Sequence, residues 1–79
     1  MRISVDISLY PLDKNYIEPI KKFISVVNTT DGLEVDTNKM STQIRGESDI
    51  IFDLLKNEIP NVFEENRAAF ILKVIKGSD

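Results

Sequence analysis

The side chains best suited to binding chemistry lie at alternate positions near the start of the chain, at Ser4, Asp6, Ser8 and Tyr10. A hydroxyl group donates and accepts hydrogen bonds, whereas an ionised carboxylate only accepts them. Alternate side chains of an extended strand point to one face, so these groups would share a surface. Serine and aspartate are poor strand formers, and their compact side chains would let a ligand or a protein layer approach the sheet. An ordinary solvated face would give the same pattern, so both interpretations stay open.

A second polar group lies in the middle of the chain, where Asn38 precedes Ser41 and Gln43. The side-chain amide of Gln43 both donates and accepts hydrogen bonds. Neighbouring strands hold such groups about 5 Å apart. These residues would therefore add hydrogen-bonding groups to the same open face.

Asp6 is the most demanding of these groups, because an unpaired carboxylate beneath a covering layer is costly. One interpretation is a cross-strand ion pair with Arg45 or Lys73. The other is a hydrogen bond from a ligand donor to the Asp6 carboxylate. The two are compatible, since a paired carboxylate keeps free lone pairs.

The 79 residues contain no histidine and no cysteine, which removes the commonest general base, a thiolate nucleophile and the commonest metal ligands. The serine and threonine hydroxyls have no histidine to activate them, so we predict no catalytic residues and no enzyme. Acidic neighbours such as Glu64 and Glu65 are typical of a solvated surface, so we predict no metal site and no cofactor. Ten basic against thirteen acidic residues argue against nucleic acid as a partner.

The apolar runs of the chain are too short to span a membrane. Residues 1–6 carry charges where a signal peptide needs an apolar stretch. We therefore expect a cytoplasmic protein. Its length predicts a single domain over residues 1–79.

The elements that would position these groups follow from hydrophobic periodicity. Period-two alternation predicts strands over residues 2–10, 33–37, 42–46 and 68–75, and helical spacing predicts helices over 15–28 and 49–66. Asn15 with Glu18 would cap the first helix, Ser48 or Asp49 the second, and Pro60 should kink or split the latter. The order β-α-β-β-α-β predicts an α+β ferredoxin-like sandwich, with sheet order 4-1-3-2 and both helices on one face.

The predicted core comprises the apolar residues on the helix-facing side of the strands and on the inner sides of the helices. They are Ile3, Val5, Ile7, Leu9, Ile20, Ile24, Val35, Ile44, Leu55, Phe70, Leu72 and Val74. An RNA-recognition sheet stacks bases on aromatics of its central strands, whereas here these strands offer only Tyr10, at the end of the first. The first strand–helix turn, residues 10–14, lacks the glycine and arginine of an acylphosphatase phosphate cradle.

Three segments of the chain together resemble the YkoF-like thiamine-binding protein family: residues 6–11 (DISLYP), 16–20 (YIEPI) and 41–47 (STQIRGE). The resemblance covers residues 3 to about 75, and the Ser-Thr-x-Ile-x-Gly-Glu stretch is its most specific part. It implies binding of thiamine or its hydroxymethylpyrimidine moiety in clefts where sheets or subunits meet, without known catalysis. Ser8, Ser41 and Thr42 lie in the matching segments.

The predicted ligand-binding residues are therefore those of the open sheet face together with the matching segments: Asp6, Ser8, Tyr10, Asn38, Ser41, Thr42 and Gln43. We also expect a homo-oligomer, a dimer or tetramer, because residues 68–75 form an apolar edge strand that invites pairing. The alternative to a small-molecule binding protein is a homo-oligomeric structural or regulatory module whose open face serves only assembly.

Overall fold

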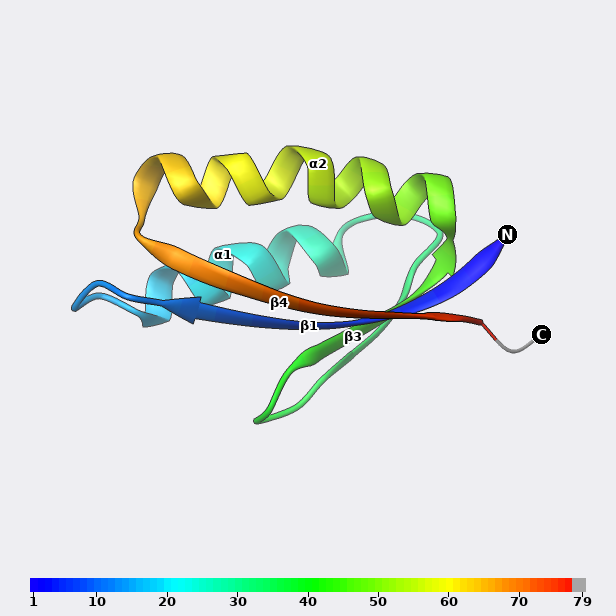
Figure 1. Cartoon of the computed structure of the whole chain (residues 1–79), viewed down its shortest axis with the longest axis horizontal. Helices are drawn as coiled ribbons and strands as arrows, with labels where there is room; N and C mark the ends of the chain where they lie inside the picture. Colours follow the sequence, from blue (N-terminus) through cyan, green and yellow to red (C-terminus); the bar gives the residue numbers. More distant parts are fainter. Residues whose placement is uncertain (78–79) are drawn as a thin grey trace.

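The computed structural model of the protein describes residues 1–77 and contains one four-stranded sheet covered by two helices. Both helices lie on the same side of the sheet, and the other side is left open (Figure 1). The elements along the chain are β1 (Arg2–Pro11), α1 (Ile17–Asn28), β2 (Glu34–Thr37), β3 (Thr42–Glu47), α2 (Ser48–Glu65) and β4 (Ala68–Lys76).

The strand order in the sheet is β2-β3-β1-β4, and every neighbouring pair is antiparallel. The predicted ferredoxin-like topology is therefore confirmed. β1 and β3 are the two inner strands, and β1 pairs with β3 over residues 2–7 and with β4 over residues 3–11.

The core lies between the sheet and the helices. Alternate residues of β1 are buried there because the period of two sends Ile3, Val5 and Ile7 to the helix side. At one end of the core, the Phe70 ring packs edge-on against Phe23 and Phe63, with ring centroids 5.5 and 5.7 Å apart. The buried apolar residues of the described chain are Ile3, Val5, Ile7, Phe23, Val27, Ile44, Ile51, Leu54, Leu55 and Val62.

The prediction that Leu72 and Val74 lie in the core is wrong, because their side chains are 39% and 46% exposed. They do face the helix side, since they pair with Ile7 and Val5. β4 is the last strand of the sheet, so it has a neighbour on one side only. Alternation predicts the face of a side chain but not how far the covering layer extends over an edge.

The core residues expected from α1, Ile20 and Ile24, are only partly buried. The residues that this helix buries are Pro19, Phe23 and Val27. Residues four apart on a helix share one side, and this series is centred on Phe23, whose large ring reaches the core.

The predicted helix caps are also wrong. The N-cap residues are Tyr16 and Glu47, and neither makes a side-chain capping hydrogen bond. Pro60 does not split α2, which runs as one helix from Ser48 to Glu65. The turn before β2 uses Gly32 at φ 87°, a conformation that favours glycine.

Candidate ligand-binding face

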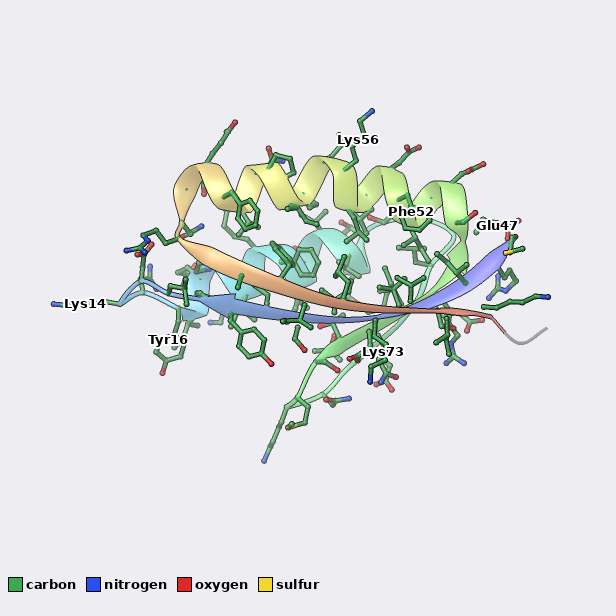
Figure 2. The ribbon with its side chains drawn as sticks, in the orientation of Figure 1. Lys14, Tyr16, Glu47, Phe52, Lys56 and Lys73 are labelled. Atoms are coloured by element: carbon green, nitrogen blue, oxygen red, sulfur yellow. The ribbon has the colours of Figure 1, made fainter. Side chains whose placement is uncertain are left out.

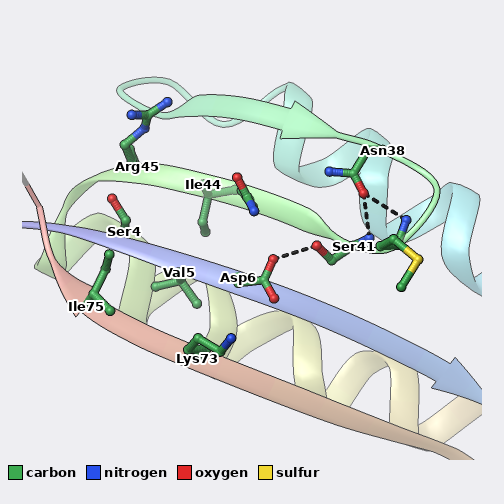
Figure 3. A pocket seen from close by; sticks show the side chains of 11 residues that line it. Ser4, Val5, Asp6, Asn38, Ser41, Ile44, Arg45, Lys73 and Ile75 are labelled. Atoms are coloured by element: carbon green, nitrogen blue, oxygen red, sulfur yellow. Dashed lines mark hydrogen bonds between the residues drawn. The ribbon is translucent and has the colours of Figure 1, made fainter.

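The open face, defined here as the sheet surface opposite the helices, contains a depression of about 500 Å³. Its polar walls come from β1, β3, β4 and the turn between β2 and β3 (Figure 3). The depression is lined by Ser4, Val5, Asp6, Asn38, Met40, Ser41, Gln43, Ile44, Arg45, Lys73 and Ile75.

Strand register places a row of polar residues straight across this face. Gln43 pairs with Asp36 on one side and with Asp6 on the other, and Asp6 in turn pairs with Lys73. Side chains opposite one another in an antiparallel pair lie about 4.5–5.5 Å apart. An amide, a carboxylate and an ammonium group are therefore presented side by side.

Asp6 is fixed within this row by Ser41. The Ser41 hydroxyl donates to Asp6 Oδ1 at 2.5 Å (Figure 3). The expected ion pair of Asp6 is not formed within residues 1–77; Arg45 Nε instead lies 3.6 Å from Glu34 Oε2. Because Ser41 binds only Oδ1, the second carboxylate oxygen remains available to a ligand donor.

Asn38 shapes the turn that carries Ser41. Its Oδ1 accepts hydrogen bonds from the backbone N–H groups of Met40 at 2.8 Å and Ser41 at 3.0 Å. Its own backbone N–H donates to the Ser41 carbonyl at 3.0 Å. This Asx turn holds the Ser41 hydroxyl next to the Asp6 carboxylate. Asn38 therefore contributes to the depression by positioning Ser41.

Thr42 lies on the other side of the sheet from the remaining candidates. It is buried among the residues that face the helices, and its Oγ1 is 3.4 Å from Thr37 Oγ1. β3 alternates from Thr42 onward, with Gln43 and Arg45 exposed and Ile44 buried. Thr42 therefore belongs to the helix-facing layer.

Ser8 and Tyr10 share the open face by alternation but do not line the depression. The pairing of β1 with β3 ends at Ile7, so beyond it β1 is paired with β4 only. Ser8 is opposite Ile71 and Tyr10 is opposite Ala69, which gives this part of the sheet a more apolar character.

The structure adds lining residues that the predicted set lacked, notably Ser4, Arg45 and Lys73. Their presence on the open face follows from alternation, and Lys73 projects to this side (Figure 2). Only the register, which sets Lys73 opposite Asp6, reveals that they surround the same depression.

Two further properties of the described chain bear on function. Across residues 1–77, no group of three or more His, Cys, Asp or Glu side chains is placed to hold a metal ion. No helix in this part of the chain is both long and apolar enough to cross a membrane.

Comparison with known proteins gives one family and several similar folds. The model of the YkoF-related family matches residues 2–74. No curated protein matches the chain.

Among solved structures, a Methanocaldococcus jannaschii hypothetical protein is 28% identical with a TM-score of 0.81, over 99% of this chain and 82% of that one. A Streptococcus pneumoniae protein is 21% identical with a TM-score of 0.88, and the match covers 99% of this chain and 89% of that one. A third similar structure is that of a Thermotoga maritima protein described as a candidate thiamine biosynthesis or salvage protein. It is 19% identical with a TM-score of 0.85, and the match covers 98% of this chain and 85% of that one.

Proposed function

Because the chain belongs to the YkoF-related family, we propose that it is a non-catalytic binding protein for thiamine or its hydroxymethylpyrimidine moiety. The similar Thermotoga maritima protein, described in terms of thiamine biosynthesis or salvage, supports the same ligand class. The observation that carries the proposal is the polar depression on the open face, with Asp6 at its centre.

The chemistry of an aminopyrimidine fits the groups in this depression. Its exocyclic amino group donates, and the ring nitrogen beside it accepts. In this proposal Asp6 Oδ2 accepts from the amino group, and the amide of Gln43, which pairs with Asp6 across the strands, donates to the ring nitrogen. The hydrogen bond from Ser41 holds the carboxylate in position before any ligand arrives.

A second subunit would complete the site. Small-molecule sites enclose roughly 70–90% of their ligand, which a depression on one sheet face does not achieve. Ile71 and Ile75 are both 60% exposed on the open face and offer an apolar rim for an opposing sheet. We therefore place the ligand between two apposed open faces, with Ser8 and Tyr10 at the border of the contact.

The side chains of the depression favour binding over catalysis. Within residues 1–77, the one hydroxyl that donates to a carboxylate is that of Ser41, and a carboxylate is a weak base for activating an alcohol. The sequence has no histidine or cysteine to take that role.

The assembly-only module remains the second candidate, because the same exposed isoleucines favour stacking of subunits whether or not a ligand lies between them. The two candidates differ in one measurable property. Only a binding protein gains stability from a ligand by mass action.

The test is thermal unfolding with thiamine, thiamine phosphates and free hydroxymethylpyrimidine. A ligand at a hundred times its Kd adds about 2.7 kcal/mol of stability, which raises the Tm of a domain of this size by several degrees. Asp6→Asn should abolish the shift. Asp36→Asn, which alters a carboxylate of the same cross-sheet row outside the depression, should keep it. A native protein that responds to none of these compounds would favour the assembly-only module.

A further inference from the structure

The depression on the open face contains a second cross-sheet row beside the one that passes through Asp6. Two residues earlier on β1, Ser4 lies opposite Arg45 of β3 and opposite Ile75 of β4. Figure 3 shows Ser4 between these two larger side chains. Two residues of a strand span about 6.6 Å, so a ligand held at Asp6 can extend to Ser4.

Ser4 gives this second row a short side chain with a free hydroxyl. The residue is half-buried and lines the depression. Its hydroxyl takes part in no hydrogen bond within residues 1–77, unlike that of Ser41, which is bound to Asp6. A serine hydroxyl can donate to an anion, and a short side chain between longer ones leaves room for one.

Two basic side chains of the depression are available to such an anion. Lys73 is exposed and forms no ion pair within residues 1–77. Arg45 contacts Glu34 through Nε at 3.6 Å, and Glu34 also lies 3.8 Å from Arg2 Nη2. One exposed carboxylate is therefore shared by two guanidinium groups. Exposed ion pairs of this kind are weak, so Arg45 can turn to a bound ligand.

The charge of the depression differs in sign from that of the whole chain. Its lining carries two basic side chains, Arg45 and Lys73, against one acidic side chain, Asp6. The Asp6 carboxylate is moreover hydrogen bonded by Ser41 and set opposite Lys73. The chain as a whole has a net charge of −3. A local excess of positive charge in an acidic protein favours a ligand that carries negative charge.

We propose that the depression binds the phosphate monoester of hydroxymethylpyrimidine, with the phosphate over Ser4 and between Arg45 and Lys73. This inference rests on the proposed function, in which Asp6 accepts from the amino group of the pyrimidine. The amino and hydroxymethyl groups are on adjacent ring carbons, so the ester phosphate leaves the ring beside the amino group. A phosphate at this position accepts hydrogen bonds from the guanidinium, ammonium and hydroxyl groups of the second row.

The same arrangement disfavours thiamine itself. In thiamine the ring carbon that carries the hydroxymethyl group of the free pyrimidine is linked to the thiazolium ring. With the pyrimidine held at Asp6, the positive thiazolium would lie beside Arg45 and Lys73, and like charges repel. A thiamine phosphate carries its phosphate beyond the thiazolium, farther from Ser4. The sign of the charge next to the pyrimidine therefore decides which ligand binds best.

Isothermal titration calorimetry of the native protein at low ionic strength tests this order. The compounds are hydroxymethylpyrimidine, its phosphate monoester, thiamine and inorganic phosphate. The ester should bind about tenfold more tightly than the free pyrimidine, because hydrogen bonds to charged groups are stronger than those between neutral groups. Thiamine and inorganic phosphate should each bind more weakly than the ester. Added salt should reduce the advantage of the ester by screening its charge.

Variants of β4 show whether Lys73 is responsible for that advantage. The quantity compared is the Kd of the free pyrimidine divided by the Kd of the ester. Lys73→Gln should lower this ratio severalfold, and Lys73→Arg should restore it, because the charge returns. Lys76→Gln is the matched control and should keep the ratio. It removes a lysine from the same strand, but Lys76 pairs with Ile3 and therefore faces the helix side.

The inference is overturned if the ester binds no more tightly than the free pyrimidine, or if thiamine binds more tightly than the ester. Equal changes of the ratio in Lys73→Gln and Lys76→Gln would overturn it as well. In these cases the proposed function stands, because an aminopyrimidine still binds. Equal binding of the ester and of inorganic phosphate, with no response to hydroxymethylpyrimidine or thiamine, would overturn the proposed function and this inference together.

Discussion

At the scale of single residues, Asp6 and Ser41 hold the candidate site together. They are far apart in the sequence, and the pairing of β1 with β3 brings them to a 2.5 Å hydrogen bond. The bond satisfies one carboxylate oxygen at a half-buried position and leaves the other directed to the depression. A fixed acceptor of this kind can select a ligand by the position of its donor.

Ser41→Ala should lower the free energy of unfolding by about 1 kcal/mol, because a half-buried carboxylate loses its donor. Urea denaturation measures the change. Ser8→Ala is the matched control, since the structure of residues 1–77 gives the Ser8 hydroxyl no hydrogen bond, and its effect should be smaller. Equal losses in the two variants would contradict the role given to Ser41.

The residues of the depression could be predicted only in part from the sequence. Alternation places Asp6 and Gln43 on one face, as the structure confirms. A shift of one position reverses the face of a strand residue, and Thr42 accordingly points to the helices. Ser8 and Tyr10 lie beyond the end of β3, and no periodicity in β1 reveals where its neighbour stops.

At the scale of the elements, the strands were easier to predict than the helices. The alternation of β1 leaves one arrangement that buries its apolar residues, and two crossovers of the same hand then dictate the strand order. The orientation of α1 depends on how the bulky Phe23 fits the core, which is a property of tertiary packing. The exposure of β4 depends on how far the helix layer reaches.

Pro60 is an element-scale feature with a measurable cost. It lies inside α2, where it removes a backbone hydrogen bond to the carbonyl of Lys56. Pro60→Ala should raise the free energy of unfolding by about 1–3 kcal/mol. The adjacent exposed change Asn61→Ala should give a smaller gain, from helix propensity alone. A Pro60→Ala variant no more stable than Asn61→Ala would show that the helix already accommodates the proline.

At the scale of the whole molecule, the two layers of this small domain leave one sheet face and one long edge exposed. The open face is polar at its centre, around Asp6, and apolar along β4. A polar centre suits a ligand, and an apolar border suits a second subunit.

The central claim is that the open face binds an aminopyrimidine ligand. Backbone amide NMR spectra of the native protein, titrated with thiamine and with free hydroxymethylpyrimidine, test it most directly. We predict saturable shifts at Asp6, Gln43 and Lys73, which share one cross-sheet row, and unshifted signals along α1. Shifts confined to the helix layer, or spectra unchanged by both compounds, would contradict the claim.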